Sequence, residues 1–217
     1  MFYIKSFTFS PIRENTYVLY NDDKNCIIID PGCYFDVEKN ELSQFINTQK
    51  LVPKMLLNTH CHLDHVFGNK FVSEKYQLIP AIHELEKEML VYAPVSGLMY
   101  EMPFENYEGE LNFLKEGDSI NIGDDELKVL FTPGHSKGSV SFYCAKQDFL
   151  ISGDVLFFRS IGRTDLPGGN HETLIKSIRE QLFILPDNTV VYSGHGQQTN
   201  IGEEKKSNPF FTVNNIT

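Results

Sequence analysis

The sequence has few cysteines, few positive charges and no long apolar run. Its cysteines show neither zinc-ribbon nor redox spacing, so we expect reduced thiols at Cys26, Cys33, Cys61 and Cys144. No apolar stretch reaches the roughly 18 residues that would span a bilayer. The N-terminal residues alternate like a strand and lack the apolar core and cleavage site of a signal peptide. We therefore expect a cytoplasmic protein with no membrane partner.

Acidic residues outnumber basic ones by 29 to 19, which gives a formal net charge of −10. This charge repels polyanions, so we expect no nucleic-acid partner. The 217 residues, 41% of them hydrophobic, are enough for a sizeable core. Because we find no internal repeat, low-complexity segment or linker, we predict a single domain over residues 1–217.

The pattern of apolar residues predicts alternating strands and helices. Strand-like runs cover residues 2–10, 15–21, 25–32, 54–58, 126–135, 139–154 and 189–196, and helical spacing covers residues 36–49, 65–76 and 171–185. Residues 84–116 differ, because a charged helix start is followed by Met, Tyr and Phe interrupted by proline and glycine. This segment is either a lid over a pocket or an irregular surface insertion that packs on its own aromatic side chains.

Three of the seven histidines lie in the seven-residue stretch "THCHLDH" at positions 59–65. The apolar run "MLLNTH" ends at His60, and three later runs end in a similar way. "VLFTPGH" ends at His135, "LISGD" at Asp154 and "VVYSGH" at His195. A glycine directly before each of the last three permits a sharp turn. Metal-capable side chains at the ends of several buried strands indicate that these residues converge at one edge of a sheet.

Imidazole and carboxylate ligands together suit zinc, iron or manganese. His60 and His62, two apart on an extended segment, can hold one ion with His135. Asp64 and His65 can reach a second ion with His195, and Asp154 can bridge the two. The predicted ligands are thus His60, His62, Asp64, His65, His135, Asp154 and His195.

This set leaves each ion short of a full shell, which is typical of a catalytic site rather than a structural one. The alternative is a histidine-rich surface loop with adventitious metal affinity. His83 and His171 follow no strand end, so we expect them at the surface or in ordinary hydrogen bonds.

The motifs "THCHLDH", "TPGHSKGSVSFY", "ISGDVLF" and "YSGHG" resemble those of the metallo-β-lactamase-fold hydrolases. The resemblance implies an α/β fold, a four-layer αββα sandwich. It also implies that Asp30 in "IIIDPG" supports the metal loop rather than binding metal. "SIGRTDLPGGN" and "GHGQQTNIGEEKKSNPF" resemble the compact glyoxalase II-like members. Full-length glyoxalase II enzymes have a further helical domain that helps to bind glutathione, and here the chain ends about twenty residues after His195. We therefore expect hydrolysis, but we do not predict a substrate that contains glutathione.

The resemblance predicts a binuclear metal-dependent hydrolase that cleaves a small-molecule thioester or similar ester. It would use two divalent ions, with zinc favoured over iron or manganese. Asp64 would ligate the second ion and orient the nucleophile. Arg163 would either meet a substrate carboxylate or form a salt bridge within its own loop.

Two other readings remain open. An oxidoreductase of the persulfide dioxygenase kind would use a single iron held by His60, His135 and Asp154. Hydrolysis of a lactone, which is a cyclic ester, is another function that the same site could perform. A scaffold that lost its chemistry is disfavoured because all seven ligand positions are filled. Diiron oxygen-reducing relatives carry a glutamate where His62 stands, a β-lactamase would be exported, and a nuclease fits badly with the acidic charge.

Overall fold

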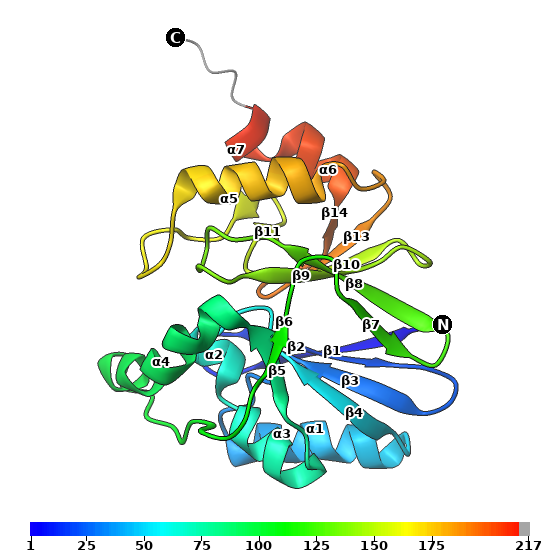
Figure 1. Cartoon of the computed structure of the whole chain (residues 1–217), viewed down its shortest axis with the longest axis vertical. Helices are drawn as coiled ribbons and strands as arrows, with labels where there is room; N and C mark the ends of the chain where they lie inside the picture. The colour runs from blue at the N-terminus through cyan, green and yellow to red at the C-terminus, as the bar shows by residue number, and fades with distance from the viewer. Residues whose placement is uncertain (213–217) are drawn as a thin grey trace. The chain divides into compact units, whose positions relative to one another are not determined.

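The computed structural model describes residues 1–212, which form two compact units (Figure 1). Unit 1 comprises Met1–Leu114 and Asn121–Asp125, and unit 2 comprises Lys115–Ile120 and the chain from Glu126 onward. The single domain over residues 1–217 stays a prediction, and its last five residues lie outside the described part.

Unit 1 is built on a six-stranded sheet whose strands follow chain order. The strands are β1 (Tyr3–Phe9), β2 (Glu14–Tyr20), β3 (Asn25–Ile29), β4 (Val52–Leu57), β5 (Pro80–His83) and β6 (Asn112–Leu114). The helices are α1 (Asp36–Thr48), α2 (Leu63–Val66), α3 (Asn69–Tyr76), the 3₁₀ turn η1 (Glu84–Glu86) and α4 (Lys87–Met99). β1 to β3 pair antiparallel, and β3 to β6 pair parallel. Helical crossovers are what parallel strands require.

Helices α1 and α3 cover one face of this sheet (Figure 1). Leu42 and Ile46 lie four residues apart on α1, so they share one side of the helix and pack into a buried cluster with Ile28 and Leu56. The start of α1 is fixed by Glu38, whose carboxylate accepts the backbone N–H groups of the two residues before the helix at 2.8 and 2.9 Å.

The second sheet has the strand order β14-β13-β10-β9-β8-β7. Its strands are β7 (Ser119–Ile122), β8 (Asp125–Phe131), β9 (Val140–Cys144), β10 (Phe149–Gly153), β13 (Val190–Ser193) and β14 (Thr199–Asn200), and a small hairpin joins β11 (Leu156–Phe157) to β12 (Ser160–Ile161). The helices are α5 (His171–Ser177), the π-helical turn η2 (Ile178–Leu182), α6 (Ile201–Ser207) and α7 (Pro209–Thr212). β8, β9 and β10 pair antiparallel, and β10 pairs parallel with β13.

Helices α5 and α6 lie on one face of the second sheet (Figure 1). Leu174, Ile178 and Leu182 recur every four residues, so they form one apolar stripe that packs with Leu150 and Val191 of the sheet. The Asn170 side chain caps α5 by accepting the Thr173 N–H at 2.8 Å. The helix predicted at 171–185 is therefore present, although its second half becomes a π-helical turn.

The helix predicted at residues 65–76 is wrong in one respect, because the chain forms two helices, α2 and α3, separated at Gly68. A Cβ at Gly68 would lie 2.4 Å from the Cys33 Sγ, so this position admits no side chain. The Gly68 N–H donates to the Pro31 carbonyl at 2.7 Å. The break therefore anchors the metal-loop helix to the turn after β3.

Residues 84–116 are more regular than the sequence indicates, because α4 runs through Pro94. Proline has no N–H for the carbonyl four residues earlier, which belongs to Leu90. The Asn106 side chain donates to that carbonyl at 2.7 Å and replaces the missing bond. The segment thus consists of a helix, a returning loop and β6, and its role as a lid stays a prediction.

All four cysteines are buried and free, which confirms the predicted reduced thiols. Burial raises the pKa of Cys26 and Cys33 to about 12. None of the helices in residues 1–212 is long and apolar enough to span a bilayer.

Candidate metal centre

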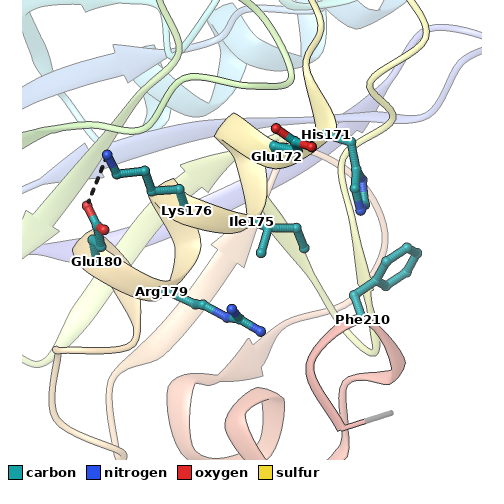
Figure 2. Close-up of a pocket in the computed structure, with 7 residues that line it drawn as sticks. All are labelled: His171, Glu172, Ile175, Lys176, Arg179, Glu180 and Phe210. Atoms are coloured by element: carbon teal, nitrogen blue, oxygen red, sulfur yellow. Dashed lines mark ion pairs between the residues drawn. The ribbon is translucent and has the colours of Figure 1, made fainter. Parts of the chain in front are cut away.

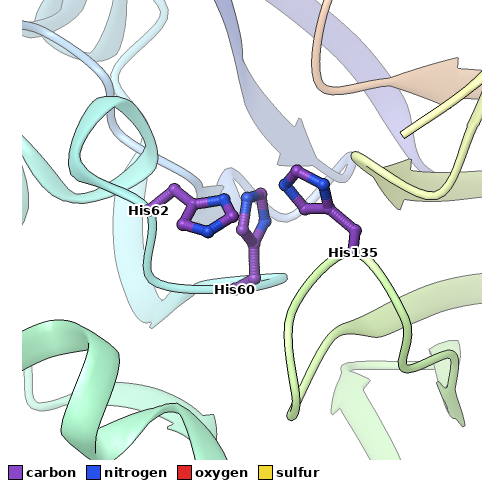
Figure 3. A group of neighbouring side chains, drawn as sticks. All are labelled: His60, His62 and His135. Atoms are coloured by element: carbon purple, nitrogen blue, oxygen red, sulfur yellow. The ribbon is translucent and has the colours of Figure 1, made fainter. Parts of the chain in front are cut away.

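The loop after β4 and helix α2, which follows it, carry four of the predicted ligands, and unit 1 brings them together. Figure 3 shows His60 and His62 on this loop, and His135 on the loop that follows β8. The His60 ring centroid lies 4.8 Å from that of His62 and 4.0 Å from that of His65. The Nε2 of His65 lies 3.8 Å from the Asp64 Oδ2. All four side chains are buried, so their position is fixed by the surrounding fold.

Asp30, at the end of β3, holds this loop in place. Its Oδ1 accepts the Thr59 N–H at 2.7 Å, and its Oδ2 lies 2.6 Å from the Thr59 hydroxyl and 3.0 Å from the His65 Nδ1. Because the Thr59 hydroxyl donates to Asp30, it can only accept from the His60 Nδ1 at 3.1 Å.

One carboxylate therefore places the Nδ1 proton on two histidines and makes Nε2 the nitrogen that a metal would bind. Oxygen and nitrogen atoms of Asp30, His60 and His65 also lie within 4.8 Å of one another. Because both Asp30 oxygens are engaged in the loop, we assign this residue to support. These hydrogen bonds agree with the supporting role implied by the family resemblance, which stays a prediction.

Two further side chains hold the loop backbone. The buried Glu86, from η1, accepts the Cys61 N–H at 2.8 Å between the two neighbouring histidines. The Asn58 side chain donates to the His65 carbonyl at 2.9 Å. Asn58 precedes the histidine motif, so its polar character at the end of an apolar strand was a visible signal. Glu86 carried no such signal, because only the folded chain brings η1 to the loop.

Unit 2 brings the other three predicted ligands together. His135 follows β8, Asp154 follows β10 and His195 follows β13. The Asp154 Oδ2 lies 3.5 Å from the His135 Nε2 and 3.5 Å from the His195 Nε2. Two ligands on one tetrahedral zinc, each about 2.0–2.2 Å from it, are about 3.4 Å apart. The same carboxylate oxygen is therefore placed to share one ion with each histidine.

His135 is oriented by the backbone around it. Its Nδ1 lies 2.8 Å from the Arg163 carbonyl oxygen, so Nδ1 carries the proton and Nε2 faces Asp154. Gly134 adopts φ +131°, and a Cβ there would lie 2.3 Å from the Leu174 backbone nitrogen. Only glycine fits where α5 packs this closely against the histidine loop.

The donors of each unit fit divalent ions. They are imidazole Nε2 atoms, with Nδ1 engaged elsewhere in His60, His65 and His135, together with two carboxylates. Neutral imidazole and carboxylate are the ligands of zinc, iron and manganese sites. The separations of 3.5 Å in unit 2 are close to the value of about 3.4 Å for two ligands of one ion, and the Asp64–His65 separation in unit 1 is 3.8 Å.

The Arg163 side chain forms a bidentate ion pair with Asp165, with N–O distances of 2.7 and 2.7 Å. This pair lowers the pKa of Asp165 to about 2. The salt bridge within the loop, one of the two readings of Arg163, is present. Its contact with a substrate carboxylate stays a prediction.

His83 and His171 lie as expected. The His83 Nδ1 accepts the Leu85 N–H at 3.3 Å and caps η1. His171 is exposed and lines a pocket of about 420 Å³ on the outer side of α5 (Figure 2). The other lining residues are the acidic Glu172 and Glu180, the basic Lys176 and Arg179, and the apolar Ile175 and Phe210.

Residues 10–195 match the model of the metallo-beta-lactamase superfamily. The chain belongs to this superfamily. A relative named probable metallo-hydrolase YqgX, from Bacillus subtilis (strain 168), is 45% identical over 92% of this chain and 93% of the relative. The hydroxyacylglutathione hydrolase GloC from Haemophilus influenzae is 36% identical over 91% of this chain and 92% of that protein.

Two solved structures have folds closely similar to that of this chain. The BLEG-1 B3 metallo-beta-lactamase has a TM-score of 0.89 and 40% identity, covering 97% of this chain and 100% of that one. TTHA1623 in a di-iron-bound form has a TM-score of 0.85 and 32% identity, covering 95% and 99%. The predicted metallo-β-lactamase fold and its α/β class are confirmed.

Membership of the metallo-β-lactamase superfamily, together with the His and Asp clusters, implies that this chain binds divalent metal. It also indicates a metal-dependent hydrolase. The sequence motifs predicted both conclusions. Neither conclusion identifies the metal that is bound or the bond that is cleaved.

Proposed function

We propose that this chain is a binuclear metal-dependent hydrolase that cleaves small-molecule thioesters. The proposed ligands of the first ion are His60, His62 and His135, and those of the second are Asp64, His65 and His195, with Asp154 bridging. One observation carries the proposal: the Asp154 Oδ2 is 3.5 Å from the Nε2 of both His135 and His195. A single oxygen at this distance from both histidines is where a carboxylate that bridges two neighbouring ions would have to lie.

Two ions held by these residues would supply a hydroxide nucleophile near neutral pH and positive charge opposite the developing oxyanion. The chain's own residues prepare that chemistry. Asp30 and Thr59 keep the protons of His60 and His65 on Nδ1. Asp64, buried in the first turn of α2, would ligate the second ion and orient the nucleophile.

A thioester suits this site because its leaving group needs little help. Free thiols ionise near a pKa of about 8.5, so a thiolate departs without a dedicated general acid. The sequence offers no clear candidate for such an acid. The name of the Haemophilus influenzae relative, hydroxyacylglutathione hydrolase, supports the same substrate class. Arg163 would meet a substrate carboxylate once released from Asp165.

The main competitor is a single-iron oxidoreductase that uses His60, His135 and Asp154. A single-iron site needs no second group of metal ligands, whereas Asp64 and His65 form a second group beside His60. A β-lactam hydrolase is the other candidate, because BLEG-1, 40% identical to this chain, is called a B3 metallo-beta-lactamase.

The test combines metal content with a substrate panel. Protein purified without added metal is analysed for metals and assayed without oxygen on thioesters that include lactoylglutathione, on matched oxygen esters, on a lactone and on a β-lactam. We expect two divalent ions per chain and hydrolysis of thioesters ahead of the other substrates. Asp154→Ala should lose at least one ion and the activity. One iron per chain with oxygen consumption, or β-lactam hydrolysis alone, would overturn the proposal.

A further inference from the structure

The hairpin of β11 and β12 lies between candidate ligands of unit 2. It begins shortly after Asp154 and is followed by Gly162 and Arg163. A Cβ at Gly162 would lie 1.9 Å from the Asp154 carbonyl oxygen and 3.1 Å from the His135 Nδ1, so the chain passes directly against both ligands. The next carbonyl, that of Arg163, accepts from the His135 Nδ1 at 2.8 Å. A shift of this end of the hairpin would therefore displace or crowd both ligands.

The hairpin also lies beside the third candidate ligand of unit 2. The Phe157 ring centroid is 6.4 Å from that of His195, with an interplanar angle of 70°. The Ser193 hydroxyl, shortly before His195 in the chain, donates to the Leu156 carbonyl at 2.7 Å. All three candidate ligands of unit 2 thus lie against the hairpin or one of its ends.

The hairpin is short, and its turn is strained. Each of its strands has two residues, and a two-stranded hairpin is only marginally stable by itself. Arg159 in the turn has φ +53°, a left-handed conformation that tight turns usually give to glycine or asparagine. The hairpin therefore needs partners from outside itself.

The C-terminal helix α6 supplies these partners. The Oε2 of Glu204 accepts the Arg159 backbone N–H at 3.0 Å and the Asn208 side-chain N–H at 2.7 Å. Asn208, at the end of α6, also donates to the Ser160 carbonyl at 3.0 Å. The other oxygen of Glu204 accepts the Thr199 hydroxyl. Glu204 and Asn208 are both fully buried, so water cannot replace these contacts.

We propose that Glu204 and Asn208 are positioning residues of the metal centre. They clamp the β11–β12 hairpin and thereby hold Asp154 and His135 where an ion can bind them. This inference rests on the ligand roles given under the proposed function. Both residues belong to the C-terminal motif "GHGQQTNIGEEKKSNPF", from which the metal centre itself uses only His195.

The burial of Glu204 indicates a task beyond attaching the helix. Apolar packing of Ile201 in a cluster with Leu150 and Val191 already holds α6 on the sheet. A buried carboxylate is costly unless hydrogen bonds satisfy it. Two of its donors belong to the hairpin turn and to Asn208, which binds the same turn. The position of the turn is therefore what this carboxylate determines.

The experiment titrates the metal-free full chain with Co²⁺ in competition with a chelator. Co²⁺ binds nitrogen and oxygen donors, and its visible absorption changes with the arrangement of its ligands. Glu204→Ala should lower the affinity for Co²⁺ about tenfold and alter the visible spectrum. Tenfold is the lower end of the effect of groups that orient metal ligands, because Glu204 acts through the hairpin backbone.

Glu204→Gln should retain the affinity and the spectrum of the unaltered chain. Its side-chain oxygen can accept from Arg159 and Asn208, while its NH₂ group donates to the Thr199 hydroxyl, which can accept as well as donate. Asn208→Ala leaves the Ser160 carbonyl without its donor and should lower the Co²⁺ affinity in the same direction as Glu204→Ala.

Two control variants separate positioning from stability. Leu127→Ala removes a fully buried side chain near the start of β8, whereas His135 follows the end of this strand. It should lower stability through the cavity that it leaves and keep the Co²⁺ affinity. Lys205→Ala removes an ion pair between α6 and Asp187 that does not involve the hairpin, and it should also keep the affinity.

Urea unfolding of the metal-free variants measures stability, and Asn208→Ala carries the test if Glu204→Ala does not fold. Unchanged Co²⁺ binding by both variants would overturn the inference. So would an equal loss of affinity in Leu127→Ala, or a Glu204→Gln variant that binds no better than Glu204→Ala. If Asp154→Ala loses an ion while Glu204→Ala does not, the proposed ligands stand and the clamp alone is refuted. Thioester cleavage plays no part in this test.

Discussion

The hydrogen bonds of Asp30 predict that Asp30→Asn will weaken metal binding by changing histidine tautomers. The new Oδ1 must still accept the Thr59 N–H, which leaves an amide NH₂ facing the Thr59 hydroxyl and the His65 Nδ1. The hydroxyl would then accept from Asn and donate to the His60 Nδ1. Both histidines would carry their proton on Nε2, the nitrogen that should bind metal.

The size of the effect follows from these contacts. Losing the partner of one metal-binding histidine typically costs about 10–100-fold in metal affinity. Two histidines are affected here, so we expect the upper end, about 100-fold, which is about 2.7 kcal/mol. Folding without metal should lose about 1.5–3 kcal/mol, the value of a hydrogen bond to a charged group. Asp30 has φ +49°, a conformation that asparagine also adopts, so the change adds no backbone strain.

Competition with a chelator measures the metal affinity, and urea unfolding in excess chelator measures stability. Glu38→Gln is the matched control, because Glu38 also accepts backbone N–H groups in unit 1, from Ser10, Tyr34 and Phe35. It should lose stability while keeping its metal affinity. If Asp30→Asn binds metal as tightly as the unaltered chain, or if both variants lose affinity equally, the tautomer argument is wrong.

Three further predictions follow. Glu86→Ala removes the acceptor of the Cys61 N–H and should lower metal affinity about tenfold. Glu86→Gln keeps an acceptor at this position and should keep the metal affinity of the unaltered chain. Equal chelator titrations for both variants would contradict a positioning role. Asn106→Ala should lower the free energy of unfolding by about 1–3 kcal/mol in the natural chain, because the Leu90 carbonyl loses its partner. In a Pro94→Ala background the backbone N–H at position 94 replaces that partner, so the same change should cost little. A double-mutant cycle in urea that finds no coupling between the two positions would refute this. Burial lowers the pKa of His83 below 6.5, so the folded chain binds fewer protons than the unfolded one and loses stability as pH falls below 6.5. His83→Asn keeps the cap of η1 and should make the free energy of unfolding in urea depend less on pH. The same pH dependence for both proteins would contradict this prediction.

The loops that carry the candidate ligands could be predicted because their signal is local. Each consists of an apolar run that ends in a polar residue, so the strand and the side chain it carries are read from the same few letters. The break at Gly68 could not be predicted in this way. It depends on Cys33, which lies far earlier in the chain and occupies the space that a side chain at position 68 would need.

The helix that runs through Pro94 could not be predicted from the sequence, for the same physical reason. Proline normally ends a helix because a carbonyl loses its partner. Here Asn106 supplies the partner from a returning loop, which the local pattern does not reveal. Glu86 likewise reaches Cys61 from 25 residues away. Local chemistry thus predicted the candidate ligands, whereas the groups that support them became visible only through long-range contacts.

The side chain of Cys61 packs in the buried apolar cluster that also contains Leu63 and Leu90. Burial raises the pKa of its thiol well above the usual range, so it stays protonated at physiological pH. The loop therefore presents only nitrogen and oxygen to an incoming ion, although a sulfur lies between two of its histidines in the chain. Soft ions such as Cu(I), which select thiolates, gain no anchor here.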